Sequence, residues 1–314
     1  MPFSDLIGQS QAIALLDRAI AKERIAPAYL FVGTAGIGKR LAALAFSELL
    51  LCQNLPESRY PLIRQKIQAQ NHPDFLWVQP TYQHQGQLLT AEEAAKSGLK
   101  RRSPPQIRVE QIRAIAGFLA RPPLEASRSV VVIEDAQTMA ESAANALLKT
   151  LEEPGKATII LIAPSGDSLL STLVSRCQRI PFSRLSQKQV KQILKGEGRE
   201  EILGEPILLA IAQGSPGEAI VAWEQLQNIP ADLLKKLVQL PKTEKNALEL
   251  AKEVDKTLDS ETQLWAIDYL QYCYWQKHKT RSILEQLEQA RKYLLAYAQP
   301  RLVWECTFIS LIDS

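Results

Sequence analysis

The sequence has few residues of the kinds that form cross-links or bind metals. Its 314 residues include four cysteines and three histidines. The cysteines lie far apart and form no Cys-x-x-Cys pair, which argues against a disulfide framework and against a structural zinc site. No histidine has a second ligand at metal-binding spacing, so each is expected on the surface or in a turn. These residues are Cys52, Cys177, Cys273, Cys306, His72, His84 and His278.

The sequence also has little net charge and no long apolar run. The formal net charge of +3 is too small to identify a nucleic-acid partner. No apolar run approaches the roughly 18 residues that a membrane helix needs, and the first five residues do not resemble the start of a signal peptide. We therefore expect a cytoplasmic protein of two or three domains that has no membrane partner.

The most informative stretch is residues 28–40, which reads AYLFVGTAGIGKR. An apolar run typical of a strand leads into Gly33, Gly36, Gly38 and Lys39, and a segment with helical spacing follows. Glycine permits positive φ and close approach of the backbone, so N–H groups can surround phosphate oxygens, while lysine and the helix N-terminus add positive charge. The pattern predicts a nucleotide-binding phosphate loop; a glycine-rich turn unrelated to phosphate is the alternative.

Arg40 departs from the phosphate-loop pattern. A loop that turns over nucleotide continues with Ser or Thr, whose hydroxyl is a magnesium ligand. Arginine has no lone pair to offer a cation. We therefore expect ATP to bind weakly or not at all, Mg²⁺ to bind only with ATP, and turnover to be poor.

A second departure follows a predicted buried strand that begins at Ser129. Four consecutive β-branched residues end in Glu134 and Asp135, which places two carboxylates at the carboxyl edge of a parallel sheet. This is the Walker B position, where an NTPase normally has Asp followed by Glu. The exchanged order alters the reach of each acid by one methylene group.

Strand and helix patterns alternate from residue 28 to 183 and predict an α/β fold with a doubly wound parallel sheet. Ser10 is the expected cap of a helix that precedes the first strand. Residues 81–105 show little apolar periodicity and are expected to be an exposed excursion. Within it, Lys100, Arg101 and Arg102 form either a solvated basic face or a nucleic-acid contact.

Beyond residue 184 the patterns are helical. Proline and glycine signals divide residues 184–226 into short helices of the size of a lid domain, with Ser186 as a cap. Residues 227–314 carry an apolar and aromatic stripe, which is more typical of a helix-bundle core or a helix–helix interface than of a cofactor pocket. We expect three domains, residues 1–183, 184–226 and 227–314, with the last serving assembly.

Several motifs together resemble the bacterial clamp-loader branch of the AAA+ ATPases. They are residues 3–9, 28–39, 72–74 (HPD), 144–154 (ANALLKTLEEP) and 175–177 (SRC), so the resemblance covers residues 1 to about 225. It implies a nucleotide domain with a helical lid and a C-terminal helical collar. It also implies partners: gamma/tau and delta subunits, the sliding clamp, and primed DNA reached through the complex.

The departures from the branch indicate which kind of subunit this is. Its motors keep Ser or Thr at the position of Arg40, Asp-Glu at the acidic strand, and an arginine where Gly217 stands. Many relatives have a zinc-binding cysteine cluster, of which Cys52 alone remains, so no zinc is expected. The resemblance thus favours a stator-type subunit of the DNA polymerase III loader that has lost its own turnover.

Arg176 has a different role in the resemblance. In the family, the Ser-Arg-Cys motif supplies an arginine finger that reaches the ATP of a neighbouring subunit, where a guanidinium stabilises charge on the transferring phosphoryl group. A surface arginine that pairs with a carboxylate is the alternative. Two other functions remain open for the chain, a gamma/tau-like motor that acts in cis with Mg²⁺ and a P-loop DNA-repair helicase.

Overall fold

The computed structural model describes residues 3–97, 104–152 and 155–312. The chain forms two compact units, Met1–Gln189 and Val190–Ser314. The expected boundary near residue 183 lies close to the division between them, and the one near residue 226 falls inside the second unit. Lys100, Arg101 and Arg102 lie outside the described residues.

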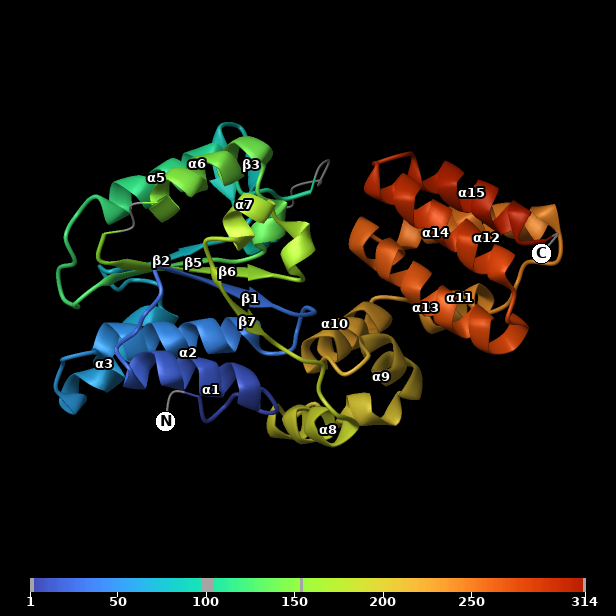
Figure 1. Ribbon diagram of the computed structural model, residues 1–314. Helices are drawn as coiled ribbons and strands as arrows, with labels where there is room; N and C mark the ends of the chain where they lie inside the picture. Colours follow the sequence, from blue (N-terminus) through green and yellow to red (C-terminus); the bar gives the residue numbers. More distant parts are fainter. Residues whose placement is uncertain (1–2, 98–103, 153–154, 313–314) are drawn as a thin grey trace. The chain divides into compact units, whose positions relative to one another are not determined.

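The first unit is built on a five-stranded parallel sheet with the order β2-β5-β6-β1-β7. Helices lie on both faces of this sheet (Figure 1). The architecture confirms the expected α/β fold. The strands are β1 (Ala28–Val32), β2 (Phe75–Val78), β5 (Ser129–Ile133), β6 (Ala157–Ala163) and β7 (Gln178–Pro181).

The residues of β1 alternate between the two faces of the sheet. Tyr29 and Phe31 pack with α1, α2 and α3, whereas Leu30 and Val32 pack with α5, α6 and α7. Because both faces are covered, the central strands are apolar along their whole length. The helices of this unit are α1 (Ser10–Ala21), α2 (Lys39–Cys52), α3 (Tyr60–Gln68), α4 (Ala91–Lys96), α5 (Val109–Leu119), α6 (Glu141–Glu152) and α7 (Ser171–Val174), with short 3₁₀ turns η1 (Glu57–Arg59), η2 (Ala136–Thr138) and η3 (Gly166–Ser168).

One local expectation for this unit was wrong, and two were incomplete. Ser10 is the first residue of α1, and the side chain of the preceding Gln9 is buried against the carbonyl oxygens of Ile37 and Ser183 instead of capping the helix. The described part of residues 81–105 is largely exposed, as expected, but it also contains a hairpin, β3 (Tyr82–His84) and β4 (Gln87–Leu89), whose turn residues Gln85 and Gly86 have positive φ. His72 lies in a turn, where its carbonyl oxygen accepts the N–H of Phe75 at 3.1 Å, and the residue is buried.

The second unit is helical throughout its described residues. Its helices are α8 (Gln187–Gly196), which begins in the first unit, α9 (Pro206–Ala212), α10 (Pro216–Gln227), α11 (Ala231–Leu237), α12 (Glu244–Thr257), α13 (Ser260–His278), α14 (Arg281–Leu295) and α15 (Pro300–Ser310), with the 3₁₀ turn η4 (Glu200–Gly204). The Ser186 hydroxyl accepts the backbone N–H of Gln189, and the Gln189 side-chain oxygen accepts the backbone N–H of Ser186. The expected cap of α8 is therefore confirmed.

Two apolar clusters hold the second unit together. Helices α11 to α15 enclose the fully buried Trp304, whose indole donates to Gln263 at 2.9 Å. Helices α9 and α10 pack on α13 through Leu208, Ala222 and Tyr269. The apolar stripe expected here is only partly core, because Trp275 is 44% exposed.

Candidate functional site

The phosphate loop joins β1 to α2 and adopts the predicted glycine-dependent shape. Gly33, Gly36 and Gly38 have φ angles of 152°, 69° and 102°. A Cβ on Gly33 would lie 2.6 Å from the carbonyl oxygen of Phe182, so a larger residue does not fit the turn. Gly38 is the residue before α2, its backbone is left-handed, and no side chain caps the helix.

A pocket of about 390 Å³ lies beside this loop. It brings together six of the eight predicted site residues: Gly36, Gly38, Lys39, Arg40, Glu134 and Asp135. Gly33 shapes the loop without lining the pocket, and Arg176 does not line it.

The Lys39 ammonium group is turned back onto the loop itself. Lys39 is buried, and its Nζ donates to the carbonyl oxygens of Gly33 and Thr34. In a nucleotide site this ammonium reaches the β- and γ-phosphates. Here it satisfies backbone acceptors of its own loop.

Arg40 makes the most informative contact in the pocket. Its Nη1 lies 2.9 Å from Oε2 of Glu134, and its Cζ lies 4.8 Å above the centre of the Trp77 ring. The Trp77 indole N–H donates to the same Glu134 oxygen at 3.0 Å. The residue that replaces the magnesium-binding hydroxyl is therefore bound to the acid that would face the metal.

Asp135 is oriented differently from Glu134. Its backbone is left-handed, with φ 48°, and its Oδ1 accepts a hydrogen bond from the Gln137 side chain at 3.2 Å. Its backbone carbonyl accepts from the Thr138 hydroxyl at 2.8 Å, which secures the η2 turn. Glu134 and Asp135, at the carboxyl edge of the sheet, thus form hydrogen bonds with different partners.

This donor set does not fit a magnesium ion. Mg²⁺ needs oxygen ligands in near-octahedral geometry. The hydroxyl ligand is absent at Arg40, and one oxygen of Glu134 already accepts two hydrogen bonds. Within the described ranges, no group of three or more His, Cys, Asp or Glu side chains could hold a metal ion.

Arg176 lies on the surface between α7 and β7. Its side chain is 40% exposed, its Nη2 lies 3.0 Å from Oε1 of Glu152, and its Nη1 donates to the carbonyl of Thr172 at 3.1 Å. The pairing with a surface carboxylate, weighed as the alternative for this residue, is thus present in the single chain. Beside it, burial raises the pKa of the Cys177 thiol to about 11, so this thiol is protonated at neutral pH.

Gly217, which stands where the motors have an arginine, lies in the first turn of α10. The Ser215 hydroxyl caps that helix by accepting the N–H of Glu218 at 3.1 Å.

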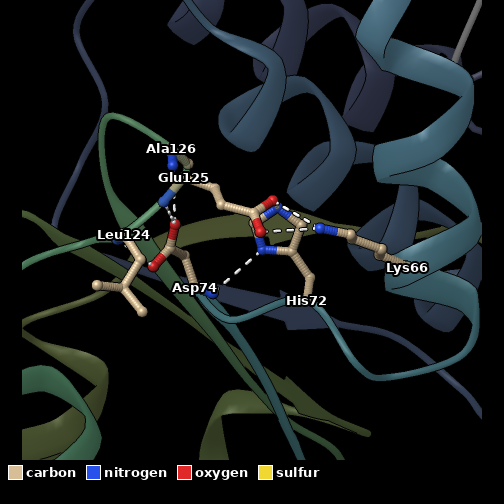
Figure 2. A network of polar contacts seen from close by, with 6 residues as sticks. All are labelled: Lys66, His72, Asp74, Leu124, Glu125 and Ala126. Atoms are coloured by element: carbon tan, nitrogen blue, oxygen red, sulfur yellow. Dashed lines mark hydrogen bonds and ion pairs between the residues drawn. The ribbon is translucent and has the colours of Figure 1, made fainter.

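The His-Pro-Asp motif braces a loop (Figure 2). Asp74 is buried and accepts the backbone N–H groups of residues 124, 125 and 126 at 2.7, 2.8 and 2.8 Å. The Nδ1 of His72 accepts the N–H of Asp74 at 3.1 Å, and burial lowers the pKa of His72. The Nζ of Lys66 lies 2.7 Å from Oε2 of Glu125, and the same oxygen lies 3.9 Å from Nε2 of His72.

Two residues that position the site were not identified from the sequence. Gln9 donates to the carbonyl oxygens of Ile37 and Ser183 and accepts the N–H of Ser183, which ties the phosphate loop to the end of β7. Trp77 holds Glu134. The sequence signal for Gln9 was a polar residue next to the apolar residues that precede α1. The signal for Trp77 was an indole on the strand beside the one that ends in the two acids.

The fold and the phosphate-loop pocket define an AAA+-type P-loop protein. The family model described as "DNA polymerase III, delta subunit" matches residues 8–186, and the one described as "Cyanobacterial DNA polymerase III delta prime, C-terminal domain" matches residues 188–311. The chain therefore belongs to the delta-prime family of DNA polymerase III clamp-loader subunits.

Individual relatives agree with this assignment. DNA polymerase III subunit delta' of Bacillus subtilis is 34% identical over 189 residues, 59% of this chain and 51% of that protein. The Pseudomonas aeruginosa subunit delta' is 34% identical over 212 residues, 65% of this chain and 57% of that protein. The matches thus span little more than half the length of these relatives.

A solved structure has the same fold. The gamma subunit-related protein of Thermotoga maritima superposes with a TM-score of 0.56 at 18% identity, covering 96% of this chain and 99% of that one. None of the helices in the described residues combines the length and the apolar character of a membrane span.

Proposed function

We propose that this chain is a stator-type subunit of the DNA polymerase III clamp loader. It assembles with gamma/tau and delta subunits, contributes Arg176 to the ATP site of a neighbour, and thereby helps to place the sliding clamp on primed DNA. The observation that supports this most is the pairing of Arg40 with Glu134, because it leaves the chain's own pocket without the groups that bind Mg²⁺.

The surface position of Arg176 suits a role in trans. Both Arg176 and its partner Glu152 are solvent-exposed, and exposed ion pairs contribute only about 0–1 kcal/mol. A neighbouring triphosphate carries more negative charge than one carboxylate and accepts a bidentate guanidinium well. Exchange of Glu152 for such a phosphate therefore costs the subunit little.

The C-terminal helices suit a role in assembly. Trp275, Tyr293 and Leu302, on α13, α14 and α15, are 44%, 50% and 55% exposed, although they belong to helices whose other faces form a well-packed core. Large exposed apolar side chains are favoured in protein interfaces. We assign these helices to contacts with the partner subunits.

The first test is assembly. The chain is mixed with gamma/tau and delta subunits, and the product is weighed by native mass spectrometry. A complex that contains this chain is expected, and its absence would contradict the stator assignment. The isolated chain is expected to hydrolyse no ATP, whereas turnover at motor-like rates would favour the gamma/tau-like alternative.

The second test isolates Arg176. Arg176→Ala is expected to leave assembly intact and to lower the DNA-stimulated turnover at the neighbouring site at least tenfold, since arginine fingers contribute about 10³–10⁵ in kcat. The matched control is Arg179→Ala, which removes an exposed arginine from β7. Unchanged ATPase in the assembled Arg176→Ala complex would remove this residue from the mechanism.

A further inference from the structure

The position of Arg40 suggests what kind of ligand the phosphate-loop pocket accepts. In phosphate-loop NTPases a divalent cation bridges the acidic strand and the phosphates. In this chain a guanidinium contacts the acid instead, with Arg40 Nη1 at 2.9 Å from Glu134. We propose that the pocket binds a nucleoside polyphosphate without a divalent cation, and that Arg40 takes the cation's place. The inference refines the site of the proposed stator and rests on that assignment.

Arg40 has the donors that such a bridge needs. A guanidinium carries five N–H donors in a planar fork. One of its nitrogens, Nη1, contacts Glu134, while 51% of the side chain remains exposed. The same pocket is lined by Gly36, Gly38 and Lys39. A phosphate cradled by this loop would therefore lie beside Arg40, which can contact phosphate and carboxylate at once.

Trp77 makes the arrangement specific for a guanidinium. Its ring lies under Arg40, where a planar cation stacks well and a hydrated metal ion does not. Its indole N–H occupies the same oxygen of Glu134 that Arg40 contacts. A divalent cation at this oxygen would have to displace both donors.

This arrangement reverses the usual effect of magnesium. When Mg²⁺ binds a nucleotide in solution it neutralises charge on the phosphates. That charge is what attracts Arg40 and the loop lysine, so Mg²⁺ is expected to weaken binding to this chain rather than to strengthen it.

The experiment is isothermal titration of the full chain with ADP and with ATP, in EDTA and then in excess Mg²⁺. The wild type is expected to bind both nucleotides in EDTA, with the same or higher affinity than in Mg²⁺. Arg40→Thr removes the guanidinium and restores a hydroxyl, so it is expected to lose at least tenfold in affinity in EDTA, which is about 1.4 kcal/mol, and to regain binding when Mg²⁺ is added. Arg59→Thr, the same exchange at an exposed arginine of η1, should match the wild type in both conditions.

Two outcomes would overturn the inference: a wild type that binds neither nucleotide in EDTA, or one whose binding requires Mg²⁺. Either result leaves assembly with gamma/tau and delta subunits untouched. Conversely, failure of assembly with metal-free nucleotide binding intact would count against the stator role alone.

Discussion

Asp74 is the residue whose replacement should most clearly reveal how the His-Pro-Asp motif works. Its carboxylate is buried, with 2% of the residue exposed, and accepts three backbone N–H groups from residues 124–126 at 2.7–2.8 Å. One oxygen accepts two of these bonds and the other accepts one. Asp74→Asn keeps the shape of the side chain and removes one acceptor and the charge.

The cost follows from the geometry. The asparagine oxygen can take the position with two bonds, and its NH₂ group then faces the N–H of Leu124. A buried donor left without an acceptor costs about 1–3 kcal/mol, and two charge-assisted bonds become neutral bonds that are each weaker by roughly 1 kcal/mol. The sum is a loss of about 3–5 kcal/mol. In a unit of this size that loss lowers Tm by about 6–20 °C.

Thermal unfolding and amide hydrogen exchange measure the effect together. Because the chain has two units, exchange is followed separately in peptides from the first unit and in peptides from α12 to α15, which serve as the internal reference. Protection should fall at residues 124–126, which lie in one loop (Figure 2). Asp167→Asn, at an exposed aspartate of η3, should stay within about 0.5 kcal/mol of the wild type. If Asp74→Asn unfolds at the same temperature as the wild type and its loop keeps the same exchange protection, then packing, and not the carboxylate, holds this segment.

Three further predictions use other features of the fold. Gly33→Ala places a Cβ 2.6 Å from the Phe182 carbonyl oxygen and should cost at least about 2 kcal/mol in urea unfolding, whereas Gly117→Ala, on the open face of α5, should stabilise by about 0.5–1 kcal/mol. His72 has a lowered pKa because it is buried, so below about pH 6.5 the unfolded chain takes up a proton that the folded chain does not. The free energy of unfolding in urea should therefore fall on acidification to pH 5.5, by up to about 1.4 kcal/mol per pH unit, and less steeply in His72→Gln. Tyr274→Phe leaves a buried carbonyl at the end of α11 without its donor and should cost the second unit about 1–2 kcal/mol, measured as the loss of exchange protection there.

The fold could be predicted because its signals are local. Continuous apolar runs identified β1, β5 and β6, and glycine positions fixed the phosphate loop before α2, since these patterns depend on a few neighbouring residues. The hairpin of β3 and β4 was missed because its strands have three residues each, too few to show alternation. The burial of His72 was not predicted because it depends on a backbone donor two residues away and on packing that no sequence spacing shows.

For the site, the sequence predicted which residues belong to it but not how they contact one another. Six residues chosen for their types line one pocket, which follows from the parallel sheet bringing strand ends to one edge. Their contacts were not predictable, because Arg40 meets Trp77 and Glu134 across 37 and 94 positions of the chain, and the side-chain conformations that allow this depend on the folded pocket. Likewise, the motif assigns Lys39 to phosphate, but its ammonium group donates to carbonyl oxygens of its own loop.

The contacts also change how the departures from the motor pattern should be understood. Taken as separate losses, Arg40 and the exchanged order of Glu134 and Asp135 would each reduce turnover independently. In the structure they form one arrangement, because the longer Glu134 side chain reaches both Arg40 and the Trp77 indole, while the left-handed backbone turns Asp135 toward Gln137. Arg40→Thr therefore should not create turnover by itself, since Trp77 still holds Glu134 and Asp135 still has its own partner. Restoration of hydrolysis would therefore require all of these contacts to be released together.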